Sequence, residues 1–139
     1  MIRLGKLPDY GLLIAVTLVD ADDLLKTSEV VQRAKIPLAT VRRLLKCMVD
    51  AGLIESVRGN KGGYRLARPA RRISVADVIQ AIDGPIAMTS CSGNNPDNRC
   101  SLEPSCPLAH KWCELNYEIV EKLRAVSVEE MAAGPKVNV

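Results

Sequence analysis

The chain has 139 residues, enough for one domain with a buried core, and no apolar run reaches the about 18 residues that a membrane span needs. Hydrophobic residues make up 47% of the sequence but aromatic residues only 3%, so aliphatic side chains must build the interior, which favours helices. Residues 1–72 carry fourteen Lys and Arg against seven Asp and Glu, and residues 73–139 carry five against nine, so the basic half is expected to meet a polyanion unless it is merely a solvated surface.

The first twenty residues are apolar enough to raise the question of an export signal. An Asp interrupts the entry to the apolar stretch and no small-residue cleavage site follows, so we predict a core helix in an unexported, cytoplasmic protein. Pro8 can occupy the first turn of this helix, which is expected to end near Asp20. In a reducing cytosol, a cysteine cluster is expected to bind metal or do redox chemistry rather than form disulfides.

Residues 27–52 predict two short helices joined by a tight turn. Thr27 or Ser28 can cap a helix through SEVVQRAK, KIPL is typical of a turn, and a longer helix ends near Gly52. On the longer helix, apolar residues recur at the i, i+3, i+4, i+7 spacing of a buried stripe: Val41, Leu44, Leu45 and Met48. The opposite face carries Ala39, Arg42, Arg43 and Lys46. This arrangement is typical of a helix-turn-helix.

The next stretch, LIESVRGNKGGYRLAR, predicts a β-hairpin. Residues 53–57 and 64–67 alternate as strands do, and the glycines of RGNKGG allow the positive φ and close approach of a hairpin tip. The loop lacks the G-x-x-x-x-G-K-[ST] pattern and precedes a strand, which excludes a phosphate-binding glycine loop. A basic hairpin after a basic helix predicts a winged helix-turn-helix that binds double-stranded DNA. The residues expected at the DNA, with the helix in the major groove and Arg58 at the minor groove or phosphates, are Ala39, Thr40, Arg42, Arg43, Lys46, Arg58, Asn60 and Lys61.

Two further helices follow the hairpin. Ser74 can cap the first, SVADVIQAID, which Gly84-Pro85 ends, and the second runs from about Pro107 through Ala125. The second helix carries a nearly heptad apolar stripe: Leu108, Trp112, Leu115, Ile119, Leu123 and Val126. Such a stripe must be buried, so we expect a homodimer seam, with packing on the chain's own domain as the alternative. The last stretch, SVEEMAAGPKVNV, is expected to form a short capped helix and then to fray.

Three motifs follow this order of elements: LPDYGL opens the first helix, VRGNKGGYRLAR forms the wing, and ISVADVIQAIDGP precedes the cysteines. Together they resemble the Rrf-two family of winged-helix regulators, with its IscR-like and NsrR-like members. RLGKLPDYG and DGPIAMTSC look closest to the branch of SUF-system iron–sulfur assembly regulators. The resemblance implies a cytoplasmic, dimeric transcription factor whose three-cysteine loop, where present, holds an iron–sulfur cluster. The fold class is then mainly α, with a winged helix-turn-helix DNA-binding domain (1–84), a cluster-binding loop (85–106) and a long C-terminal dimerisation helix with its tail (107–139).

Four of the five cysteines and the single histidine lie in CSGNNPDNRCSLEPSCPLAHKWC, residues 91–113. Cys91, Cys100 and Cys106 are spaced C-x8-C-x5-C and align with the family's three cluster ligands, although the first interval is longer than is usual in the family. Zinc is the main alternative, because three Cys and a His are also a zinc set, but only Cys106 and His110 have the close spacing of zinc pairs. Free or disulfide-bonded thiols are a third reading. Cys113 and Cys47 are expected to be packed rather than ligating.

Three cysteines leave one coordination site to be filled. His110 is favoured because it lies about one helical turn beyond Cys106, although the IscR-like pattern has its histidine at the position of Ala109. By resemblance, histidine ligation implies a 2Fe–2S cluster. Asp9 is the alternative, since NsrR-like relatives use an aspartate there, reaching from the partner subunit, and it implies a 4Fe–4S cluster. Without a metal, Asp9 is a helix N-terminal acid favoured by the macrodipole. Cys113 or an exogenous ligand is the remaining choice.

We therefore predict an iron–sulfur-sensing, DNA-binding transcriptional regulator of iron–sulfur assembly or of redox and nitrosative stress genes, with repression favoured. The alternatives are a zinc-binding or metal-independent winged-helix regulator and, less favoured, a small iron–sulfur electron-transfer protein. A nucleophilic-cysteine enzyme is not expected, because the single histidine leaves no triad to build. Neither a membrane nor a small-molecule substrate is expected as a partner.

Overall fold

The computed structural model describes residues 1–93 and 96–135, and the fraying expected of the last four residues lies outside them. Its helices and strands are α1 (Lys6–Val19), α2 (Thr27–Ala34), α3 (Leu38–Asp50), β1 (Ile54–Val57), β2 (Gly63–Leu66), α4 (Val75–Asp83), α5 (Ala109–Ala125) and α6 (Val128–Ala132). Short 3-10 turns lie at Ala70–Arg72, Pro96–Asn98 and Glu103–Ser105. A mainly helical chain with one antiparallel pair of strands confirms the predicted fold class.

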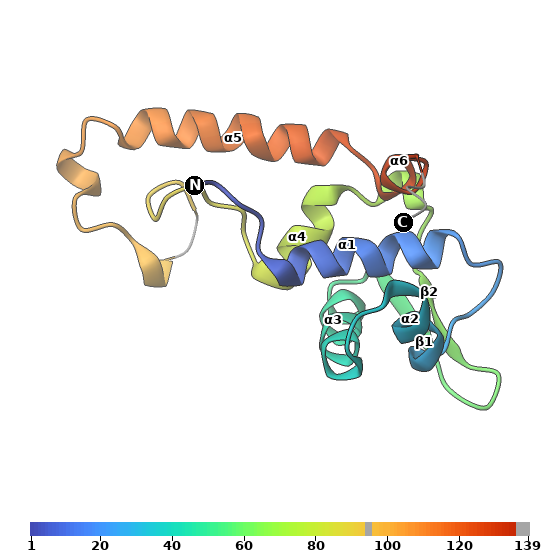
Figure 1. Cartoon of the computed structure of the whole chain (residues 1–139). Coiled ribbons are helices and arrows are strands. Elements are labelled where there is room, and N and C mark those ends of the chain that lie inside the picture. Colours follow the sequence, from blue (N-terminus) through green and yellow to red (C-terminus); the bar gives the residue numbers. More distant parts are fainter. Residues whose placement is uncertain (94–95, 136–139) are drawn as a thin grey trace.

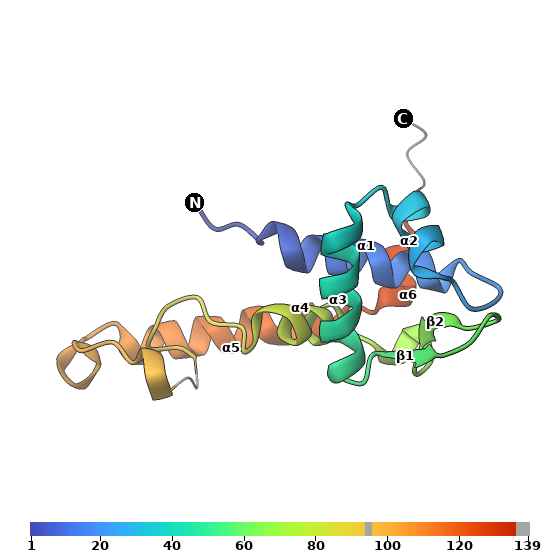
Figure 2. The same cartoon turned by 90° about the horizontal axis from the view of Figure 1, so that it is seen from below.

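The elements form a body from which one arm extends. Helix α1 crosses the middle of the body, with α2, α3 and the hairpin on one side and α5 and α6 on the other (Figure 1). We call residues 85–125, the loop after α4 together with α5, the arm. In both views the loop and the first half of α5 lie away from the body (Figures 1 and 2). The arm therefore carries Cys91, Cys100, Cys106 and Cys113 at a distance from the helix-turn-helix.

The core of the body is aliphatic, as the composition predicts. The stripe expected on α3 is fully buried, because Val41, Leu44 and Met48 have no exposed surface and Leu45 almost none. Ile14 of α1 is equally buried against it. Aliphatic burial of this kind stabilises a small domain by about 25 cal/mol for each Å² removed from water. Within residues 1–93 and 96–135, no helix is long and apolar enough to cross a membrane.

The helix ends follow the predicted signals with one exception. Gly52 has the left-handed φ of +75° expected of a C-terminal glycine after α3. Helix α2 was predicted to have Thr27 or Ser28 as its cap, and this was wrong: the capping residue is Lys26. The Glu29 carboxylate accepts a hydrogen bond from the Lys26 backbone N–H at 2.8 Å. An acidic side chain in the first turn therefore makes a capping hydrogen bond where a hydroxyl was expected to cap the helix.

The hairpin forms as predicted, and its glycines explain why it is tight. Strand β1 pairs with β2 in an antiparallel register that sets Ile54 opposite Leu66 and Val57 opposite Gly63. A Cβ on Gly62 would collide with the Val57 carbonyl oxygen, and one on Gly63 would lie 2.7 Å from the backbone oxygen of Leu25. The backbone approaches that form the wing therefore exclude side chains at both positions.

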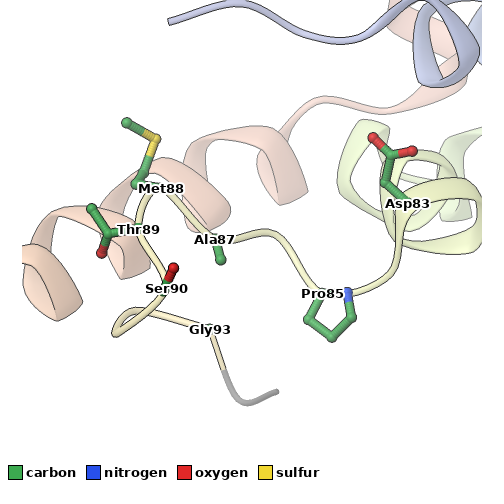
Figure 3. Close-up of a pocket in the computed structure, with 7 residues that line it drawn as sticks. All are labelled: Asp83, Pro85, Ala87, Met88, Thr89, Ser90 and Gly93. Atoms are coloured by element: carbon green, nitrogen blue, oxygen red, sulfur yellow. The ribbon is translucent and has the colours of Figure 1, made fainter. Parts of the chain in front are cut away.

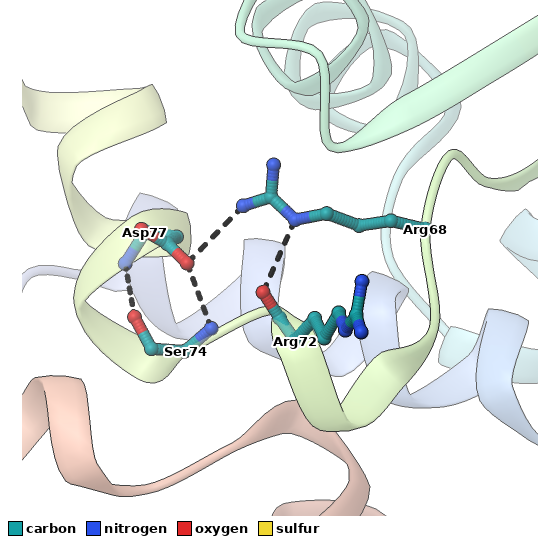
Figure 4. Close-up of polar contacts among 4 residues, drawn as sticks. All are labelled: Arg68, Arg72, Ser74 and Asp77. Carbon is teal, nitrogen blue, oxygen red and sulfur yellow. Dashed lines mark hydrogen bonds and ion pairs between the residues drawn. The ribbon is translucent and has the colours of Figure 1, made fainter.

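The end of the hairpin is fastened to α4 by one carboxylate. The Arg68 guanidinium donates from Nη2 to Asp77 Oδ2 at 3.3 Å and from Nε to the Arg72 carbonyl oxygen at 3.1 Å (Figure 4). Asp77 Oδ2 also accepts from the Ser74 backbone N–H at 2.9 Å, while Ser74 Oγ accepts from the Asp77 N–H at 3.0 Å. This capping box confirms Ser74 as the cap of α4.

Helix α5 leaves much of its apolar stripe exposed. Packing on the chain's own domain accounts for Leu123, which lies against the core, but Leu108 and Leu115 remain 57% and 40% exposed. After α5 the chain returns to the body, because Val128 of α6 is fully buried and its N–H donates to the Ile73 carbonyl at 2.8 Å. Part of the segment predicted to be a tail thus belongs to the core.

Candidate metal-binding loop and nucleic-acid interface

One buried side chain fastens the loop of the arm to α5. Asn116 is 7% exposed and is the buried residue of α5. Its Oδ1 accepts from the Met88 backbone N–H at 2.8 Å, and its Nδ2 donates to the carbonyl oxygens of Ile86 at 3.0 Å and Ser92 at 3.3 Å. A carboxamide offers both donors and an acceptor, so one side chain can hold three points of an irregular backbone.

The first cysteine lies in a turn that this contact holds. Ser92 Oγ donates to the Thr89 carbonyl oxygen and accepts from the Thr89 N–H, both at 3.0 Å. Thr89 Oγ1 lies 3.1 Å from Cys91 Sγ. Figure 3 shows the chain leaving α4 at Asp83 and passing Ala87 and Met88 on its way to this turn, around a shallow cavity of about 380 Å³. Cys91 itself is partly exposed on this hydrogen-bonded turn.

The other two predicted cluster ligands lie on the second half of the loop. Cys100 precedes the Glu103–Ser105 turn and Cys106 follows it, and both are partly exposed. All five cysteines are free. Three accessible thiols on one loop suit a soft metal by their chemistry. Among the described residues, however, no group of three His, Cys, Asp or Glu is gathered closely enough to hold a metal ion.

The candidates for a fourth ligand have different surroundings. The His110 side chain is 88% exposed, and its Nε2 lies 3.0 Å from Glu114 Oε1. Lys111 donates a hydrogen bond to Glu114 at 2.6 Å, which raises the pKa of Lys111 and lowers that of Glu114. Asp9 lies on α1 and lines an apolar groove of about 770 Å³, together with Met88 of the loop.

The two cysteines outside this set differ from their predicted burial. Cys113 was expected to be packed, and this was wrong, because it is exposed at the edge of the contact between α5 and the loop. Its Sγ donates to the Cys91 carbonyl oxygen at 3.5 Å. Cys47, expected to fill the core, is only partly buried.

Most of the residues predicted to meet DNA are exposed, either on α3 or at the tip of the hairpin. Ala39, Arg42, Arg43 and Lys46 on α3 are exposed, whereas Thr40 is half-buried. Arg58, Asn60 and Lys61 are exposed at the tip of the hairpin. In the view from below, α3 lies in front with the hairpin beside it (Figure 2).

A shallow hollow joins α3 to the wing. Arg42 and Lys46 line it from α3, and Ser56 and Tyr64 line it from the strands. Thr27 at the start of α2, and Val49 and Asp50 of α3, also line it. Thr27, Ser56 and Tyr64 could not be predicted as neighbours of the basic helix, because they come from three segments with no shared motif. Lys46 is partly neutralised by Asp50 at 3.2 Å on the same helix.

Comparison with known proteins agrees with this architecture. Residues 6–134 match the Rrf2 family, described as "Iron-dependent Transcriptional regulator". The "HTH-type transcriptional regulator IscR" of Xenorhabdus nematophila is 34% identical over 79% of this chain, which spans 65% of that relative's length. The "HTH-type transcriptional repressor NsrR" of Streptomyces coelicolor is 28% identical over 96% of this chain and 90% of its own. The structure of CymR of B. subtilis superposes with a TM-score of 0.74 at 21% identity, over 98% of this chain and all of that one, and so shares the fold.

The contact between Asn116 and the loop gives a prediction about local stability. Asn116→Ala leaves the Met88 N–H and two carbonyls without their partner, so the free energy of local opening should fall by about 1–3 kcal/mol. Hydrogen exchange followed by mass spectrometry should show faster exchange in residues 86–92. Tyr117→Ala, which changes an exposed neighbour on the same helix, is the control. Unchanged exchange in Asn116→Ala would mean that the loop does not depend on this side chain.

Proposed function

The chain belongs to the Rrf2 family of transcriptional regulators, and we propose that it is a cytoplasmic repressor that senses an iron–sulfur cluster and controls iron–sulfur assembly or redox and nitrosative stress genes. It is a DNA-binding regulator of the IscR and NsrR kind, and not an enzyme. The observation that carries the proposal is the loop of free, partly exposed thiols that Asn116 fastens to α5. The exposed basic surface of α3 and the wing lies on a separate part of the molecule.

For the cluster, we assign Cys91, Cys100 and Cys106 as the thiolate ligands and His110 as the fourth. Cys100 and Cys106 flank the short Glu103–Ser105 turn, and the Cys100 carbonyl accepts a hydrogen bond from the Glu103 N–H within the same loop. His110 stands at the start of α5 with its ring in solvent, so it can turn from Glu114 toward the loop. This set favours a 2Fe–2S cluster, with Asp9 and a 4Fe–4S cluster as the alternative. When bound, the cluster would supply a group sensitive to oxidants and iron supply.

The cluster proposal is tested on protein purified without oxygen. Absorption and Mössbauer spectra, with iron, sulfide and zinc contents, should show a cluster in the wild type and in Cys47→Ser. The cluster should be lost or unstable in Cys91→Ser, Cys100→Ser and Cys106→Ser, because each removes a thiolate. His110→Ala should shift the spectrum and Asp9→Ala should not. A colourless protein with stoichiometric zinc would contradict the proposal, and a shift in Asp9→Ala alone would reverse the choice of fourth ligand.

For DNA, we propose that Arg42, Arg43 and Lys46 enter the major groove while Arg58 reaches the minor groove or the phosphates. Ala39 and Thr40 would lie beside them on α3, and Asn60 and Lys61 at the wing tip. The exposure of the arginines and the hollow that joins α3 to the strands support one continuous contact surface. A dimer would place two such surfaces on a roughly palindromic site.

The DNA contacts are tested with a duplex selected from random sequence by the wild-type protein. At fixed salt, Arg43→Ala or Arg58→Ala should weaken binding by about 1–3 kcal/mol if the side chain contacts a base. Arg124→Ala removes a charge that is paired with Glu121 on α5, and it should change the affinity little. Unchanged binding in both Arg43→Ala and Arg58→Ala would place the DNA elsewhere.

For assembly, we propose a homodimer that buries the apolar face of the arm. Leu108 and Leu115 are exposed on an extended arm, and Trp112 on the same stripe is only half-buried. The apolar groove of about 770 Å³ between α1, α4 and α5 adds Ile119 to this surface. An exposed apolar surface of this extent is typical of an interface, and a second copy in two-fold symmetry covers it economically.

The dimer is tested by sedimentation at micromolar concentration. Leu115→Asp places a charge in the proposed interface without changing a core residue, so it should give a folded monomer with wild-type circular dichroism. Lys122→Asp, on an exposed part of the same helix, should remain dimeric. A wild-type protein that sediments as a monomer would refute the interface.

A further inference from the structure

Cys113 lies on α5, outside the loop, and contacts the loop at Cys91. Its sulfur donates to the backbone oxygen of Cys91 at 3.5 Å, and all five cysteines are free. Cys113 is exposed and Cys91 partly exposed, so both are open to small oxidants. We propose that Cys91 and Cys113 form a reversible disulfide when the protein holds no metal and meets a peroxide.

The contact of Asn116 keeps the two cysteines adjacent. Cys113 and Asn116 are three residues apart on α5 and so share one face of the helix. On that face Asn116 holds the carbonyl of Ser92, the residue next to Cys91, at 3.3 Å, and the N–H of Met88 at 2.8 Å. These contacts on either side of Cys91 hold its backbone against α5.

Pairing then requires one side chain to turn. Cys91 Sγ lies 3.1 Å from Thr89 Oγ1 and must leave this hydroxyl to reach Cys113. A disulfide needs Cα atoms about 4.4–6.8 Å apart. The 3.5 Å contact between the Cys113 sulfur and the Cys91 carbonyl oxygen is compatible with that spacing, and rotation of the Cys91 side chain would then bring the two sulfurs together. The hydroxyl of Thr89 retains Ser92 Oγ as a partner at 3.1 Å after the sulfur has turned.

The chemistry balances with hydrogen peroxide as the oxidant. The sulfur of the more exposed Cys113 attacks one peroxide oxygen, the O–O bond breaks, and a sulfenic acid and one water form. The Cys91 sulfur then attacks the sulfenic sulfur, the S–O bond breaks, and a second water leaves as the disulfide forms. In sum, two thiols and one peroxide give one disulfide and two waters. A small thiol such as glutathione reverses the step by exchange through a mixed disulfide.

Chain entropy alone predicts a different pair. Cys100 and Cys106 are six residues apart and Cys91 and Cys100 are nine apart, whereas Cys91 and Cys113 are separated by 22. Closing the shorter loops costs less in a flexible chain. Preferential pairing of Cys91 with Cys113 would therefore report the folded contact and not the spacing of the cysteines.

The proposed disulfide depends only on the contact between Cys113 and Cys91, but one consequence of it also depends on the proposed function. If Cys91 is a cluster ligand, the disulfide removes it from the set, so oxidised apoprotein cannot accept a cluster until it is reduced. Peroxide exposure would then hold the regulator in its cluster-free state after the oxidant has gone.

The test is a cross-link map of metal-free protein. The reduced protein is freed of reductant, treated with hydrogen peroxide, blocked with N-ethylmaleimide and digested with trypsin. Cleavage after Arg72, Arg99, Lys111 and Lys122 places Cys91 in peptide 73–99, Cys100 with Cys106 in 100–111, and Cys113 in 112–122. The expected product joins 73–99 to 112–122, with two thiols lost per chain and full recovery with dithiothreitol.

Matched variants make the outcome decisive. Cys113→Ser should abolish the cross-link, Cys47→Ser should leave it unchanged, and Asn116→Ala should slow its formation several-fold by releasing the loop. A dominant link within 100–111, a Cys113 link between two chains, or no disulfide at all would overturn the proposal. Failure of the proposed function would look different, because the cross-link would form in a protein that never takes up iron and sulfide.

Discussion

The arm depends on one buried carboxamide. A loop of more than twenty residues with little regular structure has no reason of its own to lie along a helix, because each of its polar backbone groups is as well served by water. Asn116 changes this, since its three hydrogen bonds to Ile86, Met88 and Ser92 exchange water for a partner that is already ordered in α5. Because Met88 and Ser92 flank Cys91, this contact also fixes the backbone position of Cys91.

The segment that follows α5 is bonded to the body, and these hydrogen bonds connect it with the base of the wing. After α5, the Val126 carbonyl accepts from the Val75 N–H at 2.9 Å, and the Val128 N–H donates to Ile73 at 2.8 Å. These bonds hold the start of α4, where Asp77 binds Arg68 at the end of the hairpin. A change at the loop thus has a continuous physical route to the basic surface. This route couples the two sites only if a change at the loop measurably alters the affinity of the basic surface for DNA.

The body could be predicted from the sequence because its signals are local. The buried stripe of α3, the glycines of the hairpin and the capping box of α4 each act within a few residues, and each was confirmed. The predicted cap of α2 was wrong. The sequence offered two hydroxyls as capping groups, whereas the hydrogen bond that forms is made by Glu29 and depends on the geometry of the turn.

The arm was harder to predict because its contacts are long-range. Nothing in the spacing of the residues marks Asn116, which lies 24 to 30 residues from the groups that it binds. For the same reason Cys113 was assigned to packing when it stands exposed beside Cys91. Among the described residues, the three proposed cluster cysteines do not lie close enough together to form a metal site. Metal ligands on a loop are often brought together only by the metal that they bind.

The proposed repressor can sense a cluster only if the state of the cysteine loop controls the affinity of the protein for DNA. The decisive measurement is the dissociation constant for one selected duplex, measured without oxygen at fixed salt, for the same preparation before and after its iron and sulfide are removed. Coupling between two sites in a protein is typically about 1–3 kcal/mol, so we expect the two constants to differ by about tenfold or more. Equal constants, with the duplex still bound specifically in both forms, would show that the cysteine loop does not control DNA binding.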